Sequence, residues 1–279
     1  MDTPDMNITP ADSGAASAIH CIGDSHVCFF SGHDTIHRGW PVESETRLSW
    51  FRTYRIGSAL AYNLSRSGTT TRGRERLFEV LETKVPPGAR VLLVFGEIDC
   101  RAHLVKQSKS KGLPIETVVE LCLDEYFKAV REVVARGFRV IVYNVVPSRS
   151  SMQGKLIADG ETLPTTGTWR ERNRATRLFN DGARRRCVGC GAAFLENYSH
   201  LVDGDGKTVG WYFWDSIHLS QRAMPATLEN LRALCPDLGI PPQMVMHPGR
   251  CDLIMDVVRR RFGRLFKDAG KIFQIFGAS

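Results

Sequence analysis

A serine lies between an aspartate and a histidine in the stretch CIGDSHVCFF, residues 21–30. A serine hydroxyl becomes a nucleophile when a base takes its proton and a third group orients that base. The stretch WDSIHLS, residues 214–220, offers such a base and its partner in His218 and Asp215. Because these two residues are three positions apart, one short turn could present both to Ser25. We expect Asp215 to accept the Nδ1 proton of His218, so that Nε2 faces the serine.

The residues by themselves leave other interpretations of Ser25 open. A serine between a strand and a helix is often the helix N-cap, and a Gly-Asp-Ser turn at a helix N-terminus can bind an anion. His218 taken alone would more often be a structural or surface histidine. The triad hypothesis therefore depends on a fold that brings the two distant stretches together.

Short runs of β-branched and large apolar residues indicate strands buried on both faces of a parallel sheet. They cover residues 18–23, 90–96, 138–146 and 192–198. Segments 114–137 and 168–187 are the candidate helices between them. This alternation predicts right-handed βαβ units in a three-layer α/β/α fold, where ligands bind beyond the carboxyl ends of the strands. Ser25, the segment 96–101 and the loop after Val146 would all lie at that edge.

The blocks Gly23-Asp24-Ser25 and Asp215-Ser216-Ile217-His218 together resemble the first and last sequence blocks of the GDSL, or SGNH, hydrolases. The resemblance extends over roughly residues 18–235. It implies an α/β/α sandwich with a flavodoxin-like parallel sheet, and the activity of an esterase, lipase, thioesterase, O-deacetylase or acyltransferase. It also implies that Ser25 is the nucleophile, His218 the base and Asp215 its partner, with no metal or organic cofactor.

The middle blocks of the chain match this family less closely. The second block of the family is a glycine whose N–H helps to bind the oxyanion, and Gly57 follows Ser25 at a suitable distance. The third block, Gly-x-Asn-Asp, reads Gly-Glu-Ile-Asp at residues 96–99. Ile98 cannot donate a hydrogen bond, and losing one oxyanion donor costs about 3 to 4 kcal/mol. We expect the backbone N–H groups of Ser25 and Gly57 to be the remaining donors.

Polar residues and a glycine at the same sheet edge are candidates for the substrate pocket. They are Asp24, Gly96, Glu97, Asp99 and Arg101. Charges at a buried sheet edge must be paired, so we expect Arg101 to form an ion pair with Glu97 or Asp99 and to shape the pocket floor. A purely structural salt bridge is an equally open interpretation of the two acidic residues.

These residues favour a serine esterase or O-deacylase that acts on a small O-acyl ester, on a carbohydrate or another hydroxyl-rich metabolite. The two alternatives are an O-acyltransferase of the same fold and a catalytically degenerate protein that binds a glycan or a protein partner. Ile98 motivates the second alternative. The residues do not separate hydrolysis from transfer, because the two reactions differ only in which nucleophile is admitted.

Composition places the chain among soluble globular proteins, with 43% apolar and 24% charged residues. The apolar runs are far shorter than the roughly 20 residues that span a bilayer. Eight cysteines without a recognisable secretory signal predict reduced thiols and a cytoplasmic location. CVGC at residues 187–190 and HDTIH at residues 33–37 lack further ligands, so we expect no metal site. No nucleotide-binding fingerprint is present.

We expect three parts along the chain: a loose leader at 1–17, the catalytic domain at 18–236, and a connector with a basic amphipathic helix at 237–279. Residues 250–279 hold seven basic residues against three aspartates. Such a helix can lie on an anionic membrane, dock on a protein partner or pack back on its own domain. The charge is otherwise nearly balanced, which argues against nucleic acid as a partner. The loop 147–169 is either a lid or a plain surface excursion.

Overall fold

The computed structural model describes residues 18–36, 43–44, 46–150, 156–158 and 161–242. Its main sheet has the strand order β2-β3-β1-β4-β5-β8. The strands are β1 (Ile19–Gly23), β2 (Glu43–Ser44), β3 (Phe51–Arg55), β4 (Arg90–Val94), β5 (Arg139–Tyr143) and β8 (Ala193–Leu195). All neighbours pair in parallel except the edge strand β2. Without β2 the order is that of flavodoxin-like sheets, which confirms the predicted fold class.

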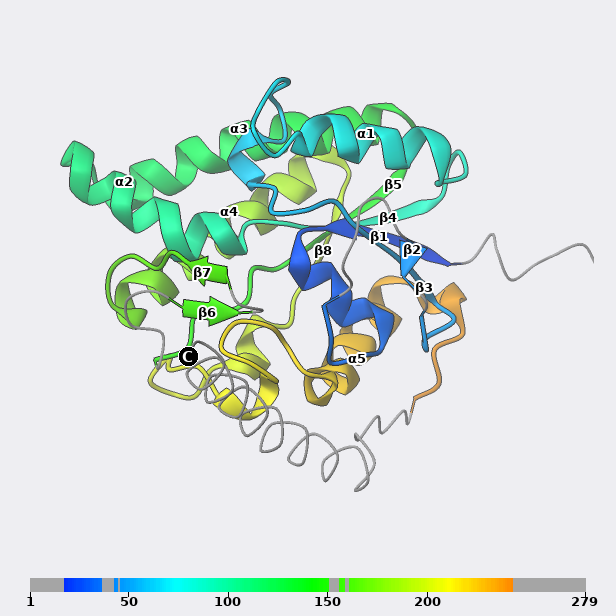
Figure 1. Ribbon diagram of the computed structural model, residues 1–279. Coiled ribbons are helices and arrows are strands. Elements are labelled where there is room, and N and C mark those ends of the chain that lie inside the picture. Colours follow the sequence, from blue (N-terminus) through cyan, green and yellow to red (C-terminus); the bar gives the residue numbers. More distant parts are fainter. Residues whose placement is uncertain (1–17, 37–42, 45, 151–155, 159–160, 243–279) are drawn as a thin grey trace, which may run out of the picture. The chain divides into compact units, whose positions relative to one another are not determined.

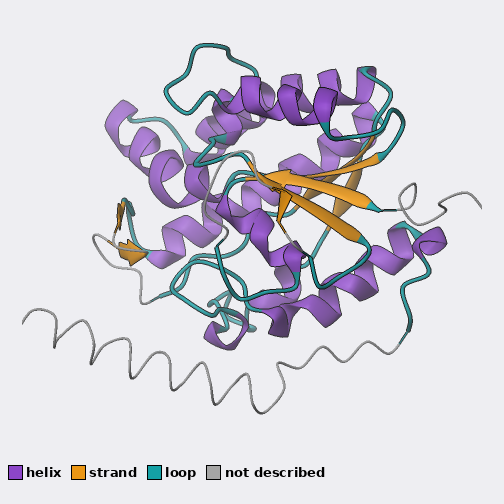
Figure 2. Ribbon diagram, turned by 45° about the vertical axis from the view of Figure 1, so that its right-hand side comes forward, coloured by secondary structure: helices purple, strands orange, loops and turns teal. Residues whose placement is uncertain are grey.

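Helices cover both faces of the sheet, as Figures 1 and 2 show. On one face lie α1 (Gly73–Thr83), α3 (Ile115–Ala135) and α4 (Trp169–Cys190), with α2 (Leu104–Lys111) beside them. The other face carries the 3₁₀ helix η1 (Ser25–Ser31) and α5 (Met224–Leu234). The smaller elements are η2 (Ala61–Asn63), η3 (Asp99–His103), a hairpin of β6 (Leu156–Ala158) and β7 (Glu161–Leu163), η4 (Tyr198–Leu201), η5 (Gly210–Tyr212), η6 (Gln221–Ala223) and η7 (Pro236–Leu238).

The core lies between the sheet and the helices α1, α3 and α4. The helix α3 turns one apolar stripe inward, including Leu123 and Phe127, and both side chains are fully buried. They pack in one cluster with Leu93 of β4 and Phe179 of α4. Burial of each large apolar side chain contributes about 1.5 to 3 kcal/mol. This packing fixes the strands whose carboxyl ends carry the polar residues singled out above.

The predicted strands at 18–23, 90–96, 138–146 and 192–198 are confirmed as β1, β4, β5 and β8. The predicted helices at 114–137 and 168–187 are confirmed as α3 and α4. A capping box starts α4, in which the Thr168 hydroxyl accepts from the Glu171 N–H and the Glu171 carboxylate accepts from the Thr168 N–H. The long loop at 147–169 contains the β6-β7 hairpin, which the sequence did not indicate.

Several predictions concern residues outside the described part of the chain. They are the leader at 1–17 and the basic amphipathic helix in 243–279, so the domain boundaries stay predictions. His37 of the HDTIH stretch also lies outside it. Among the helices that are described, none has both the length and the apolar character needed to cross a bilayer.

Candidate active site

The Gly23-Asp24-Ser25 turn lies at the carboxyl end of β1. Gly23 pairs with Val94 of β4, and a Cβ atom on Gly23 would lie 2.4 Å from the Val94 carbonyl oxygen, so the two strand ends can approach only with glycine here. The Asp24 N–H donates to the same carbonyl at 3.2 Å. The Asp24 side chain then accepts from the His26 N–H at 2.8 Å and caps η1. The N-cap is therefore Asp24, and the N-cap interpretation of Ser25 is wrong. Ser25 itself is partly exposed between these two buried neighbours.

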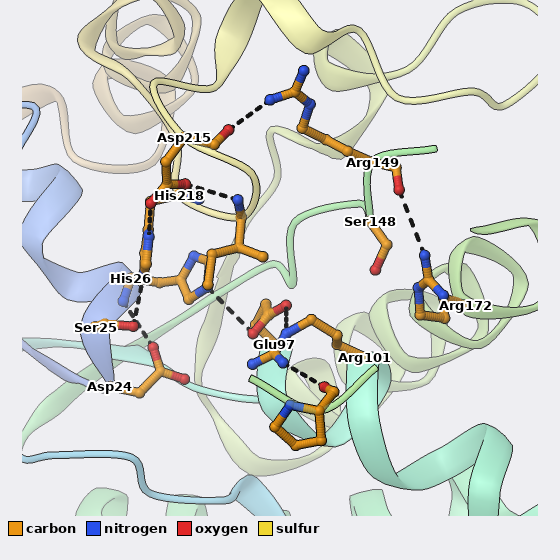
Figure 3. A network of polar contacts seen from close by, with 12 residues as sticks. Asp24, Ser25, His26, Glu97, Arg101, Ser148, Arg149, Arg172, Asp215 and His218 are labelled. Atoms are coloured by element: carbon orange, nitrogen blue, oxygen red, sulfur yellow. Dashed lines mark hydrogen bonds and ion pairs between the residues drawn. The ribbon is translucent and has the colours of Figure 1, made fainter. Parts of the chain in front are cut away.

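Ser25, His218 and Asp215 form one chain of hydrogen bonds, although 193 positions separate Ser25 from His218 (Figure 3). The Nε2 atom of His218 lies 2.8 Å from the Ser25 Oγ atom, and its Nδ1 atom lies 2.6 Å from Oδ2 of Asp215. Oδ1 of Asp215 accepts the backbone N–H groups of Ile217 at 2.7 Å and His218 at 2.6 Å. One oxygen of the carboxylate thus closes the turn, and the other orients the imidazole.

Two further side chains hold the turn that carries Asp215 and His218. Arg149, in the segment after β5, donates from its guanidinium to the Asp215 carbonyl oxygen at 2.6 Å (Figure 3). The ring of Trp214 stacks on the ring of His218, with centroids 5.7 Å apart and an angle of 19° between the planes. The guanidinium of Arg149 and the ring of Trp214 thus hold the loop from two sides of the fold.

The protonation states suit a base and its partner. Burial lowers the pKa of His218 by more than the neighbouring Asp215 raises it. Burial also raises the pKa of Asp215, but its hydrogen bonds with His218 outweigh that effect and leave the pKa below its ordinary value. At neutral pH the imidazole is therefore unprotonated and the carboxylate is charged, which is the state that can accept a proton from Ser25.

A second polar cluster lies next to this chain and consists of His26, Glu97 and Arg101, all buried. Oε1 of Glu97 accepts from Nε of Arg101 at 2.7 Å, and Oε2 of Glu97 lies 3.4 Å from Nε2 of His26. Arg101 also donates to the Pro164 carbonyl oxygen at 2.6 Å (Figure 3). The predicted ion pair of Arg101 is thus formed with Glu97, and its role in shaping a substrate pocket stays a prediction.

Asp99, the other predicted partner of Arg101, is engaged elsewhere. Its carboxylate accepts the backbone N–H groups of Ala61 at 2.8 Å and Tyr62 at 3.2 Å. Burial raises the pKa of Asp99, and these two hydrogen bonds only partly oppose that rise. Asp99 therefore ties η3 to η2, while the nearby Gly96 is buried and its carbonyl accepts the Cys100 N–H. Contact of either residue with substrate stays a prediction.

Gly57 lies beside the Ser25 turn, as the second block of the family would require. The Ile56 N–H donates to the Gly23 carbonyl at 2.8 Å, so the chain after β3 runs alongside the end of β1. Gly57 has φ +93°, and a Cβ atom there would lie 2.7 Å from the Arg76 guanidinium. Only glycine adopts this backbone readily. Gly57 is thus placed near Ser25, and donation to an oxyanion stays a proposal.

The open space beside Ser25 is small. A hollow of about 10 Å³ lies against Ser25 and His218, with Thr35, Ile36 and Trp214 among its walls. It has room for a group about the size of one water molecule. Within the described ranges, no group of three His, Cys, Asp or Glu side chains is arranged to hold a metal ion.

Sequence reasoning missed three residues that contact the candidate triad: His26, Arg149 as a brace, and Trp214 as a stacking partner. His26 stood directly after Ser25 in the quoted stretch, so its proximity was visible in the sequence. Its contact with Glu97 was not, because it depends on the neighbouring positions of β1 and β4 in the sheet.

Comparison with known proteins gives matches of structure only. No family model and no curated protein matches the sequence. The fold is similar to that of GDSL-like hydrolases. One solved structure is a GDSL-like lipase from Bacteroides thetaiotaomicron, with 12% identity, a TM-score of 0.45, and coverage of 79% of this chain and 86% of that one. Phospholipase A1 from Streptomyces albidoflavus has 13% identity and a TM-score of 0.42, over 78% of this chain and 99% of its own.

A third solved structure is LAE5, described as an alpha/beta hydrolase enzyme from the metagenome of Lake Arreo in Spain. It has 14% identity and a TM-score of 0.47, and the alignment covers 80% of this chain and 97% of LAE5. At such low identities the likeness concerns the fold. What the chain does must be argued from its own residues.

Proposed function

We propose that this chain is a serine hydrolase of the SGNH type that cleaves a small O-acyl ester through an acyl-enzyme. The continuous hydrogen-bond chain from Asp215 through His218 to Ser25 is the observation that carries the proposal. A serine that only caps a helix, or a turn that only binds an anion, does not require an imidazole hydrogen-bonded to the serine Oγ atom. It also does not require a carboxylate hydrogen-bonded to the other nitrogen of that imidazole.

In the first half of the reaction, Nε2 of His218 takes the Ser25 proton as Oγ attacks the ester carbonyl carbon. The charge of Asp215 stabilises the imidazolium that forms. His218 then gives the proton to the departing alcohol oxygen, the ester C–O bond breaks, and the acyl group remains on Ser25. In the second half His218 activates water, which releases the carboxylic acid and restores the serine.

The oxyanion of the tetrahedral intermediate needs preorganised donors. The first N–H groups of a helix have no partner within that helix, and Ser25 is the first residue of η1. We propose that the N–H groups of Ser25 and Gly57 hold the oxyanion, because Gly57 lies in the segment that runs alongside Gly23. Ile98 supplies no side-chain donor. This combination predicts a slower enzyme than one with three donors.

We propose that the acyl group is short, such as acetyl. The described residues leave only a small hollow beside Ser25, which disfavours a long acyl chain. We propose an O-acetylated carbohydrate or a related hydroxyl-rich metabolite. An O-acyltransferase would share every residue named here and would admit an acceptor hydroxyl instead of water.

The cellular setting is also part of the proposal. The seven cysteines in the described part of the chain form no disulfide with one another, which suits a reducing compartment such as the cytoplasm. We further propose that the basic segment 250–279 provides contact with an anionic membrane or a protein partner, from its composition alone.

The test is acetate release from an O-acetylated monosaccharide and from p-nitrophenyl acetate. We expect release by the wild-type chain and by Ser31→Ala, whose serine lies in the same η1 but bonds to the Cys28 carbonyl. We expect no release by Ser25→Ala. If the folded wild-type chain and Ser25→Ala bind the sugar equally and neither releases acetate, the chain is a glycan-binding protein and the proposal is wrong.

A further inference from the structure

His26 occupies a position that the proposed mechanism does not use. Its ring lies against the ring of His218, with centroids 4.8 Å apart and an angle of 37° between the planes. Only 6% of His26 is exposed, and 4% of His218. The two imidazoles are therefore close enough, in a dry environment, for a charge on one to affect proton binding by the other.

The charges around His26 come from three parts of the fold. Asp24 faces it from the turn after β1, while Glu97 and Arg101 come from the segment after β4. The third part is the 214–219 loop with His218 and its partner Asp215. While Asp24 is ionised, the carboxylates of Asp24 and Glu97 face the single guanidinium of Arg101. A protonated His26 then makes these four side chains neutral in total, whereas an unprotonated His26 leaves one uncompensated negative charge.

The ionisation tendencies agree with this geometry. Burial lowers the pKa of His26, but the contact with Glu97 and the charges of Glu97 and Asp24 together outweigh it and raise the pKa above the ordinary value. Burial lowers the pKa of His218, and the charge of His26 lowers it further. The pKa of Glu97 is held well below its ordinary value, because the charges of Arg101 and His26 overcome the effect of burial.

We propose that His26, paired with the Glu97 that Arg101 holds in place, is a positioning residue that presents a positive charge to the ring of His218 and keeps His218 unprotonated into the mildly acidic range. This inference rests on the proposed function only in taking His218 as the base. In this proposal His26 makes and breaks no bond. It acts through His218, whose ring lies against its own.

The sign of the effect follows from the order of proton binding. As the pH falls, His26 takes the first proton and His218 the second, and the rate falls only when His218 is protonated. Removing the charge of His26 therefore moves the acidic limb of kcat/KM to higher pH. For two charges about 5 Å apart at a partly screened site, a shift of roughly one pH unit is expected.

The experiment follows the histidine Cε1 resonances of the full chain by NMR between pH 4.5 and 9, with His218→Asn used for assignment. Asp24 titrates in the same range, since burial raises its pKa to about 6, so the comparison is made between variants. We expect the pKa of His218 to rise by about one unit in His26→Gln. In Glu97→Gln the pKa of His218 should change less than in His26→Gln, because His26 loses its counter-ion while the direct attraction of the Glu97 charge for a proton on His218 is lost as well.

Two controls make the result specific. Glu116→Gln removes the carboxylate of another Arg–Glu pair, on the exposed surface with Arg174, and should leave His218 unchanged. The double variant His26→Gln/Glu97→Gln should shift the pKa of His218 less than His26→Gln alone, because it also removes the charge of Glu97, which favours a proton on His218. If His26→Gln does not fold, His26→Asn takes its place.

The proposal is overturned if His218 binds its proton before His26 in the wild-type chain. It is also overturned if His26→Gln, or His26→Asn in its place, folds and leaves the pKa of His218 unchanged. The NMR titration needs no turnover, so it separates this inference from the proposed function. A chain with the expected titration but no esterase activity would keep the inference and lose the function.

Discussion

Replacing His218 by alanine is expected to lower kcat for ester hydrolysis by about 10⁴-fold or more, and replacing Ser25 by alanine should do the same. The two side chains act as one unit, because the serine is a weak nucleophile without the base that lies 2.8 Å from its Oγ atom. The double variant should therefore lose little more than either single one. Steady-state rates on p-nitrophenyl acetate measure all three variants.

Ser31→Ala is the matched control for this prediction, since Ser31 belongs to the same short helix and bonds to the Cys28 carbonyl. Its kcat should remain close to that of the wild-type chain, and the melting temperatures of Ser25→Ala and His218→Ala should show that both remain folded. A folded His218→Ala variant with a tenth or more of the wild-type kcat would exclude His218 as the base.

Replacing Arg101 by methionine is expected to lower the free energy of unfolding by about 3 to 5 kcal/mol. The substitution leaves Glu97, only 6% exposed, without the guanidinium that pairs with it at 2.7 Å. It also removes the donor to the Pro164 carbonyl oxygen. Urea denaturation measures the loss, and thermal unfolding should show a melting temperature lower by roughly 10 °C.

Arg52→Met is the control, because Arg52 pairs with Glu43 at the same 2.7 Å but both side chains are more than two-fifths exposed. Exposed pairs contribute about 0 to 1 kcal/mol, so this variant should unfold almost as the wild type does. Equal losses in the two variants would mean that burial adds nothing to the Arg101 pair. The cluster beside the triad would then be less rigid than described.

The sequence predicted those parts of the fold whose signals are local. Continuous apolar runs identified β1, β4, β5 and β8, because strands buried on both faces need no polar alternation. The stretch FRTYR at 51–55 has two arginines and a threonine, so it carried no such signal, although it pairs with β1 as β3. Its place in the sheet depends on pairing with a partner 32 positions earlier, as between Ile19 and Phe51, and local patterns do not record that.

The candidate site divides in the same way. Ser25, Asp215 and His218 were predicted from residue types and spacing, because a triad needs a fixed set of chemical groups. His26, Arg149 and Trp214 were not predicted as contacts of the triad. Their roles arise from packing between segments far apart in the sequence. A single histidine, arginine or tryptophan carries no sequence signal for such a contact. The sequence left Glu97 and Asp99 as the two possible partners of Arg101. In the structure the Asp99 carboxylate accepts a backbone N–H group of η2, and Glu97 pairs with Arg101.

Intact-mass spectrometry after incubation with a fluorophosphonate tests most directly whether Ser25 is an activated nucleophile. We expect a single adduct on the wild-type chain, mapped by peptide analysis to residues 21–30, and no adduct on Ser25→Ala. His218→Ala should react far more slowly, since its serine has no base. A folded wild-type chain that stays unmodified, or an adduct on another residue, would contradict the assignment of Ser25 as the nucleophile.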